Sequence, residues 1–392
     1  MNNPVHYSSH RSLINSSILV GDRAPVDAII VPSARRAAAL DEAGRLAEEL
    51  DCPLLVLCSR HSTAPRVARS LAHRPRLRVT AVDFPAAGVA RLPALETSTV
   101  LGESRLKRRT DTSAKRNLGL VLARMAGWKS VVFLDDDIAV PDATDLERTV
   151  ALLPARDGVG LRINGFPDNS VVCHANRETG AAQDTFIGGG ALAVPADRID
   201  SFFPEIYNED WFFLVGETML RPVAQVGVAL QKPYDPFATP DRARSQEFGD
   251  VLAEGLFALF EQGNKVADAD EDYWTAFLAT RFSFIETIRA RIEHRAESPT
   301  AREKQMLESL TASSGRLQFI RPSQCVAFIK AWDRDRACWR RFIGGVRLIS
   351  RKRRGVLPID VAVSRLGLAS VTRQALVRPR VAARRNNGDG PR

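Results

Sequence analysis

Through its first 135 residues the chain alternates short apolar runs with segments whose apolar residues recur at helical spacing. The apolar runs lie at residues 27–31, 54–57, 79–82 and 130–134. Helical patterns over residues 37–50 and from Thr112 to Gly127 lie between them. Strand, helix and strand at this rhythm predict a parallel sheet with helices on its faces. We therefore expect an α/β fold that binds its ligands at the carboxyl ends of the strands.

After residue 158 the pattern changes, first to short strands with glycine-rich turns (159–163, 171–173 and 186–194) and then, after Pro240, to helices. A length of 392 residues with 45% hydrophobic and 26% charged residues is typical of a soluble globular protein of about two domains. We divide the chain into a flexible N-terminus (1–22), a catalytic domain (23–240), a helical extension (241–312) and a basic C-terminal segment (313–392). Residues 384–392, at the end of that last segment, contain no apolar residue and are expected to be disordered.

Three adjacent carboxylates, Asp135, Asp136 and Asp137, directly follow the fourth predicted strand. In an extended segment residues i and i+2 share a face, so Asp135 and Asp137 can point into one site while Asp136 points away. Hard divalent cations such as Mg²⁺ and Mn²⁺ prefer oxygen ligands and would relieve the repulsion between these carboxylates. The motif therefore predicts a metal site. The alternative is a solvated acidic turn, in which glycine or asparagine would be more usual.

Cationic residues come before this motif in the chain. Lys115 and Arg116 lie at the start of a helical pattern, where positive charge opposes the helix dipole. A bound diphosphate would account for them, because helix N-termini and cations both attract phosphate. Arg35, just after the first predicted strand, lies at an equivalent carboxyl end. Surface solubility is the alternative explanation for any one of these cations.

A glycine run and an acidic pair come after the motif. Gly188, Gly189 and Gly190 allow a ligand to approach the backbone closely. Glu209 and Asp210 follow aromatic residues, and apolar surroundings raise the pKa of a carboxylate toward the value that a catalytic base requires. The alternative is an acidic pair at a helix N-terminus, where the helix dipole favours negative charge.

This ordered set of features resembles a nucleotide-sugar glycosyltransferase of the GT-A type, in the inverting family-two-like group. The resemblance covers roughly residues 27–237. It rests on an (A/K)RN-x-G helix, a D-x-D motif after a strand, a glycine-containing acceptor segment and an E-D pair. The matching residues are Lys115, Arg116, Asn117 and Gly119, then Asp135, Asp136 and Asp137, then Gly188, Gly189 and Gly190, and finally Glu209 and Asp210.

The resemblance implies a GT-A, Rossmann-like and mostly parallel sheet with a helical C-terminal extension. It also implies an Mg²⁺ or Mn²⁺ ion that bridges the donor diphosphate to the D-x-D motif, with Asp135 near the ribose and Asp137 on the metal. We take Asp135 and Asp137 as the metal ligands. In the inverting branch the aspartate of the E-D pair, here Asp210, deprotonates the acceptor hydroxyl, and Glu209 lies beside it. The remaining candidate donor-binding residues are Arg35, Asp83, Lys115, Arg116, Asp136 and Gly189.

Several positions depart from the family pattern. Ser59 and Arg60 replace the usual acidic residue after the second strand, which holds the nucleotide base, and Asp83 after the third strand is the candidate in its place. No histidine follows the E-D pair as a further metal ligand, and the Q/R-x-x-R-W signature of processive synthases is absent. We therefore expect a non-processive hexosyltransferase-type enzyme, with the donor sugar, the base, the acceptor and the stereochemical outcome left open.

Other functions remain as alternatives. A nucleotidyltransferase on the same kind of fold would use a glycine-rich loop after the first strand, whereas residues 32–36 contain no glycine. A haloacid-dehalogenase-like phosphatase also uses D-x-D but requires threonine where this chain has Ala139. The non-enzyme hypothesis is a binding module for nucleotide-sugar or membrane, or for nucleic acid through the basic end of the chain.

The charge of the chain is concentrated near its end. The formal net charge is +9, and residues 331–392 carry 16 Lys and Arg against 4 Asp and Glu, so the rest of the chain is slightly acidic. We therefore expect no nucleic-acid partner for the body. The basic segment, with its interleaved apolar residues, suits an anionic membrane surface. The alternative is a helix that covers the body.

Cysteines and hydropathy add further expectations. The five cysteines are widely spaced and contain no CxxC pair, which argues against a disulfide framework or a structural zinc site. No apolar run approaches the length of a membrane-spanning helix, and the polar N-terminus does not resemble a secretory signal. We therefore expect a cytoplasmic protein that can lie at the inner face of the membrane.

Overall fold

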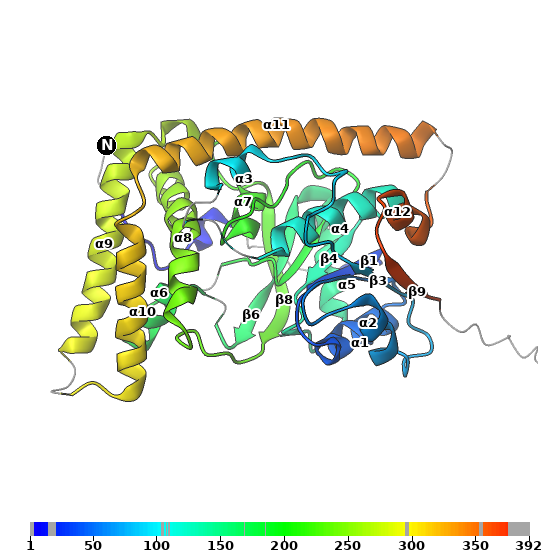
Figure 1. The fold of residues 1–392 in the computed structure, drawn as a ribbon, viewed down its shortest axis with the longest axis horizontal. Helices are drawn as coiled ribbons and strands as arrows, with labels where there is room; N and C mark the ends of the chain where they lie inside the picture. The colour runs from blue at the N-terminus through cyan, green and yellow to red at the C-terminus, as the bar shows by residue number, and fades with distance from the viewer. Residues whose placement is uncertain are drawn as a thin grey trace, which may run out of the picture.

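The computed structural model describes residues 4–14, 21–102, 106, 108, 110–167, 169–184, 186–294, 298–352 and 356–374. In this part of the chain a twisted sheet forms one side of the molecule and long helices form the other (Figure 1). The strands are β1 (Ala28–Ser33), β2 (Leu54–Cys58), β3 (Val79–Asp83), β4 (Val131–Leu134), β5 (Ile138–Ala139), β6 (Gly158–Gly165), β7 (Ala191–Val194), β8 (Val223–Gln231) and β9 (Ser370–Arg373).

These strands form one sheet in the order β5-β8-β6-β7-β4-β1-β2-β3-β9. Strands β1, β2, β3, β4, β6 and β8 point the same way, and only β5, β7 and β9 are reversed among the described strands. The predicted α/β fold with a mostly parallel sheet is therefore confirmed. Because β2 and β3 lie on one side of β1 and β4 lies on the other, the strand order reverses between β1 and β4. In doubly wound sheets such a reversal opens a crevice for ligands.

Helices cover both faces of the sheet. They are α1 (Asp41–Glu49), α2 (Ala64–Ser70), α3 (Glu96–Leu101), α4 (Thr112–Ala126), α5 (Thr144–Leu152), α6 (Val171–Glu178), α7 (Glu209–Leu214), α8 (Pro240–Glu261), α9 (Glu271–Glu293), α10 (Ala301–Leu317), α11 (Pro322–Lys352) and α12 (Ile359–Arg365). Short 3₁₀ helices are η1 (Arg11–Leu13), η2 (Ala37–Leu40), η3 (Leu153–Ala155) and η4 (Val266–Asp268).

Two apolar cores result from the alternation of side chains along each strand. In β1, Ile30 faces the larger core, which α4 and the long helices α8 to α11 share. Its neighbours Ile29 and Val31 face the smaller core, formed with α1, α2 and α5. All three side chains are fully buried, which explains why the first apolar run shows no polar alternation.

Residues 171–173, which the sequence analysis predicts to be a strand, are instead the first turn of α6. The Ser170 hydroxyl accepts a hydrogen bond from the Cys173 backbone N–H and so caps this helix. A short apolar run has no periodicity that separates a strand from a buried helical turn. Of the segment 186–194, only Ala191–Val194 is a strand.

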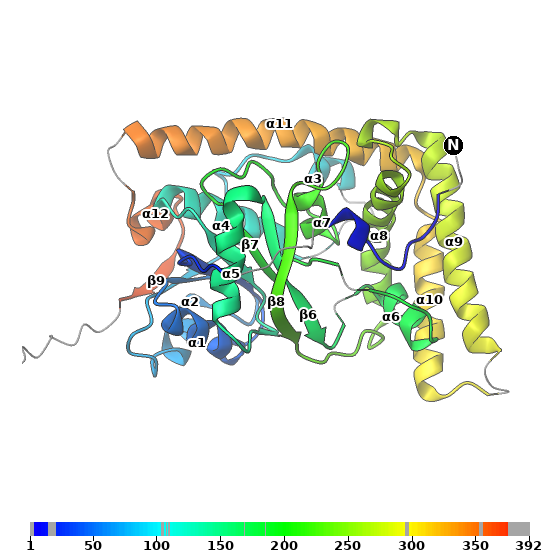
Figure 2. The same ribbon diagram turned by 180° about the vertical axis from the view of Figure 1, so that it is seen from behind.

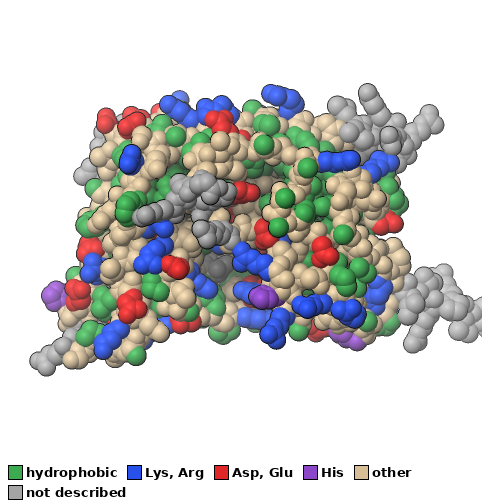
Figure 3. Space-filling model, in the orientation of Figure 1, with side chains coloured by type: hydrophobic (Ala, Val, Ile, Leu, Met, Phe, Trp, Pro, Cys, Tyr) green, Lys and Arg blue, Asp and Glu red, His purple; other side chains and the backbone are tan. Residues whose placement is uncertain are grey.

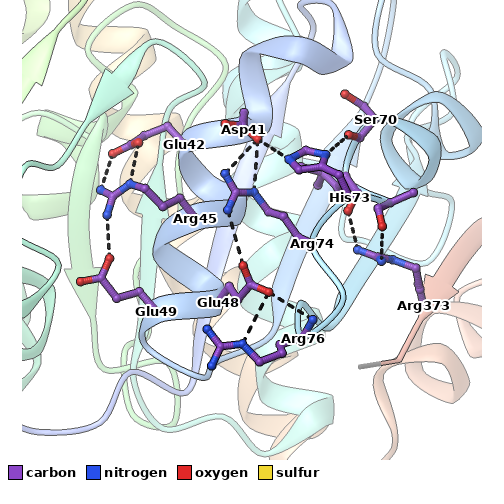
Figure 4. A network of polar contacts seen from close by, with 12 residues as sticks. Asp41, Glu42, Arg45, Glu48, Glu49, Ser70, His73, Arg74, Arg76 and Arg373 are labelled. Carbon is purple, nitrogen blue, oxygen red and sulfur yellow. Dashed lines mark hydrogen bonds and ion pairs between the residues drawn. The ribbon is translucent and has the colours of Figure 1, made fainter. Parts of the chain in front are cut away.

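The segment directly after the three aspartates is held by α1. Glu42 accepts a hydrogen bond from the Val140 backbone N–H at 3.1 Å, and Arg45 donates to the Val140 carbonyl at 2.8 Å. Figure 4 shows Glu42, Arg45 and Glu49 together on one side of α1. On another side of the same helix, Asp41 and Glu48 pair with Arg74, which follows α2 in the chain. The helix α1 therefore fixes the position of the loop that carries Asp137.

The basic C-terminal segment is part of the body as far as the structure describes it. Helix α11 lies along one edge of the molecule and spans both the helical side and the sheet side (Figures 1 and 2). Its buried residues recur every three or four positions and include Trp332, Trp339 and Ile343. Beyond it, β9 pairs antiparallel with β3. The expected disorder of residues 384–392 lies outside the described residues.

Of the expected flexible N-terminus (1–22), the structure describes residues 4–14 and 21–22, and residues 4–14 lie against the long helices. His10 Nε2 lies 3.0 Å from Glu254 Oε2 of α8, and both side chains are buried. The Thr280 hydroxyl of α9 donates to the Pro4 carbonyl at 3.0 Å. Among the described residues, no helix has both the length and the apolar character that crossing a bilayer requires.

Candidate functional site

A cavity of about 620 Å³ opens where β1 and β4 end, at the reversal of the strand order. Its size lies within the usual range for a small-molecule site. Figure 3 shows a hollow near the middle of one face, with acidic and basic side chains around it. The lining includes Arg35, Arg116, Asp135, Asp136, Asp137, Glu209 and Asp210. The structure thus brings most of the predicted site residues to a single cavity.

The three aspartates differ in how their oxygens are used. Both oxygens of Asp136 accept hydrogen bonds, one from Ser33 Oγ at 2.8 Å and one from Arg35 Nη1 at 2.5 Å. One oxygen of Asp135 accepts from Arg116 at 2.9 Å, and one oxygen of Asp137 accepts from Arg35 at 2.8 Å. Within the described part of the chain, the second oxygens of Asp135 and Asp137 accept no hydrogen bond. Asp136 is therefore committed to the end of β1, whereas its two neighbours each keep an oxygen for a ligand.

Arg116 joins the two acidic motifs. Its Nη2 donates to Asp135 Oδ1 and its Nη1 donates to Glu209 Oε1, both at 2.9 Å. The guanidinium group is almost fully buried and lies over the ring of Phe203. Arg108 donates to the other oxygen of Glu209 at 3.3 Å. Both oxygens of Glu209 are thus occupied by arginine.

Asp210 is held differently from Glu209. Its two oxygens accept hydrogen bonds from backbone N–H groups, one from Gly189 and one from Trp211 at 2.9 Å. No ion pair of its carboxylate occurs within the described part of the chain. Asp210 therefore presents a carboxylate to the cavity without direct contact with a cation, as a proton acceptor requires.

Burial changes the acidity of this group of carboxylates. The pKa of Asp135 is raised to about 7, chiefly by burial, with the charges of Asp137 and Asp136 adding to the rise and Arg116 opposing it. Burial also raises the pKa of Glu209. A divalent cation at Asp135 would lower its pKa again, because it favours the charged form.

Three predicted donor-site residues do not line the cavity. Lys115 is buried and donates from Nζ to the Ser33 carbonyl at 2.8 Å and to Ser59 Oγ at 2.6 Å, so it ties the ends of β1 and β2 together. Burial lowers its pKa. Asp83 accepts a hydrogen bond from the Ala64 backbone N–H at 2.7 Å and caps α2. Gly189 lies behind the cavity wall, against Arg116.

His174 does not line the cavity either. It is buried, its Nε2 lies 3.0 Å from the Tyr234 hydroxyl, and its ring lies 5.2 Å from that of Phe166. Burial, together with nearby arginines, lowers its pKa to about 4. The histidine is a neutral packing residue.

The residues available for a metal ion are oxygen donors. No three His, Cys, Asp or Glu side chains in the described ranges are grouped closely enough to hold a metal on their own. Mg²⁺, however, is usually held by one or two carboxylates together with substrate phosphates. The unused oxygens of Asp135 and Asp137 meet that need, and Arg35 and Arg116 lie beside them for the phosphates. The residues therefore fit a divalent cation that enters with a diphosphate.

Sequence reasoning missed part of the cavity wall. Pro32 and Ala34 follow from the rule that ligands lie at strand ends, because they lie at the end of β1. In contrast, Ser9, His10, Arg11 and Ile14 reach the cavity from the far N-terminus, and no local pattern indicates this. Their position depends on contacts with residues more than 200 positions away, such as His10 with Glu254.

Gly189→Ala is expected to destabilise the protein by about 1–3 kcal/mol, because a Cβ atom there would lie 2.5 Å from Arg116 Nη1. The guanidinium group would have to leave Asp135 and Glu209. Gly315→Ala in α10 is the control, since its Cβ would meet nothing within 4 Å and alanine suits a helix better by about 0.5–1 kcal/mol. Urea unfolding measures both, and equal stability of Gly189→Ala and wild type would contradict this packing.

No protein-family model matches this sequence, and no curated protein matches it significantly. Among solved structures, the chain is similar to the mannosyltransferase PcManGT from Pyrobaculum calidifontis in complex with GDP-Man and Mn²⁺. The two chains are 15% identical, the similarity covers 85% of this chain and 90% of the other, and the TM-score is 0.42.

Proposed function

We propose that the protein is a metal-dependent, non-processive glycosyltransferase of the GT-A type, which moves a sugar from a nucleoside-diphosphate sugar to a hydroxyl acceptor. The observation that carries the proposal is the arrangement around one cavity of Asp135 and Asp137, the arginines beside them, and Asp210. This arrangement provides a place for a diphosphate and, separately, a carboxylate that forms no ion pair with arginine among the described residues.

In this proposal Asp135 and Asp137 hold Mn²⁺ or Mg²⁺ through their unused oxygens. The bound cation would neutralise the charge that grows on the leaving diphosphate. Arg35 and Arg116 turn their guanidinium groups from the carboxylates toward the phosphates, with which arginine forms strong charged hydrogen bonds. The buried site strengthens these interactions, because little water screens them.

Asp210 acts as the base. The acceptor oxygen forms a new bond to the sugar carbon, the bond from that carbon to the diphosphate breaks, and the hydroxyl proton passes to Asp210. The hydrogen bonds from Gly189 and Trp211 hold the carboxylate in one orientation while the acceptor enters. Glu209 has both oxygens paired with arginine, so we assign it to the placement of Arg116 and Arg108 rather than to proton transfer.

The test is a panel of nucleoside-diphosphate sugars with Mn²⁺, in which release of the nucleoside diphosphate is measured for the full chain. We expect release from at least one donor, and its loss in Asp137→Ala. Asp142→Ala is the matched control, since that exposed carboxylate lies five residues further on and, among the described residues, accepts hydrogen bonds from Thr144 and Arg148 alone. Absence of both turnover and nucleotide binding with every donor would favour the binding-module alternative.

We further propose that the outer side of α11 binds an anionic membrane by charge alone. Lys330 and Arg341 are exposed there, whereas Trp339 and Ile343 are buried against the body and are not available for insertion. Binding to phosphatidylserine-containing vesicles should therefore weaken as the salt concentration rises, because the Debye screening length falls to about 3 Å at 1 M salt. Co-sedimentation that is insensitive to salt and to Lys330→Glu with Arg341→Glu would contradict this.

A further inference from the structure

Asn208, directly before Glu209 and Asp210, has a left-handed backbone conformation, with φ 61° and ψ 34°. Among the described residues other than glycine, only Asp51 and Arg60 also have a positive φ. An L-residue is disfavoured in this region, and asparagine tolerates it better than most. Non-glycine residues in this conformation persist where the surroundings enforce them, often beside functional groups.

The surroundings of Asn208 form a buried chain of polar contacts. Its Nδ2 donates to Asp250 Oδ1 of α8 at 2.9 Å. The other oxygen of Asp250 accepts from Arg281 Nη2 of α9, also at 2.9 Å. Arg281 in turn donates to Glu247 at 2.9 Å, and its Nη1 lies 3.0 Å from His6 Nε2. Asn208, Asp250, Glu247 and Arg281 are all less than 9% exposed.

On its other side, Asn208 sets the direction of α7. Its carbonyl accepts the hydrogen bond of the Phe212 backbone N–H at 3.2 Å. Asp210 lies in the first turn of this helix, with its carboxylate on the N–H groups of Gly189 and Trp211. A change of the backbone at Asn208 therefore rotates the turn that carries Asp210.

We infer that Asn208 is a positioning residue, which directs the Asp210 carboxylate toward the acceptor in the cavity. Its own side chain is held by Asp250, which in turn is held by Arg281. The inference rests on the proposed function, because it is there that Asp210 is the base. Asn208 itself transfers no proton. If it only stabilised the fold, its loss would lower stability and leave the rate of the folded enzyme unchanged.

Asn208→Gly is the sharpest variant, because glycine accepts the left-handed backbone and removes only the side-chain anchor. We expect kcat for sugar transfer to fall about 10–100-fold, the loss that misplacement by about 1 Å brings, while the donor KM changes less than about twofold. In Asn208→Ala, kcat should fall by at least the same factor. Asp51→Gly is the matched control, because Asp51 is also left-handed but lies exposed at the end of α1.

Amide hydrogen exchange in the full chain measures the hydrogen bonds from Gly189 and Trp211 to Asp210 without requiring enzyme activity. The N–H groups of Gly189 and Trp211 should exchange at least about tenfold faster in Asn208→Gly than in wild type or Asp51→Gly, since their acceptor on Asp210 moves. Unchanged exchange at both amides, or an unchanged kcat in an enzyme that does transfer sugar, would overturn the inference. Faster exchange in a protein whose wild type turns over no nucleotide-sugar would refute the proposed function and support the positioning of Asp210.

Discussion

Replacing Asp210 with asparagine is expected to lower the rate of sugar transfer about 10²–10⁴-fold, the usual loss when a general base is removed. Asparagine keeps the size of the side chain and can still accept hydrogen bonds from Gly189 and Trp211, so the fold and the donor site should be preserved. The nucleoside diphosphate should therefore bind as tightly as to wild type. Initial rates and titration calorimetry on the same preparation separate the two quantities.

Asp241→Asn is the matched control for this experiment. Its side chain is 87% exposed at the start of α8, and in the part of the chain that the structure describes it pairs only with Arg244. This control should keep the wild-type rate. If Asp210→Asn retained more than about a third of wild-type activity, or if both variants lost activity equally, Asp210 would not be the base.

Arg281→Met is expected to lower the free energy of unfolding by about 3–5 kcal/mol, because it leaves Glu247 and Asp250 buried without their shared cation. The side chain of Arg281 is 0% exposed, so water cannot replace the lost contacts. Urea unfolding of the full chain, followed by circular dichroism, measures the change.

Arg244→Met is the matched control for Arg281→Met, because Arg244 pairs with Asp241 at the surface. Its loss should change the free energy of unfolding by less than about 0.5 kcal/mol. A loss below about 1 kcal/mol for Arg281→Met would show that the buried charges of α8 and α9 are not held together as the structure has them.

The sheet could be predicted because its strands are buried on both faces. Ile29 and Ile30 face different cores, and both environments select large apolar residues, so the run is visible in the sequence. The same reasoning placed Asp135 and Asp137 at a strand end, and the structure shows that this end lies next to the reversal of the strand order. The prediction of a strand at residues 171–173 was wrong because Ser170 caps a helix that begins there. The composition of a short apolar run does not distinguish a strand from a buried helical turn.

The connections within the site could not be predicted, because they join residues far apart in the sequence. Arg116 bridges Asp135 and Glu209, which are separated by 74 positions in the chain. Lys115, one residue earlier, points instead toward Ser33 and Ser59, since adjacent residues of a helix do not share a face. The basic charge of α11 was equally visible in the sequence, but the burial of Trp339 was not.

The central claim is that a divalent cation binds Asp135 and Asp137 together with a nucleoside diphosphate. Anomalous diffraction at the manganese edge, from crystals grown with Mn²⁺ and a nucleoside diphosphate, tests it most directly. We predict an anomalous peak between these two carboxylates and the diphosphate, with Arg35 and Arg116 turned toward the phosphates. Nucleotide bound in the cavity without manganese at these carboxylates, or manganese bound only elsewhere, would contradict it.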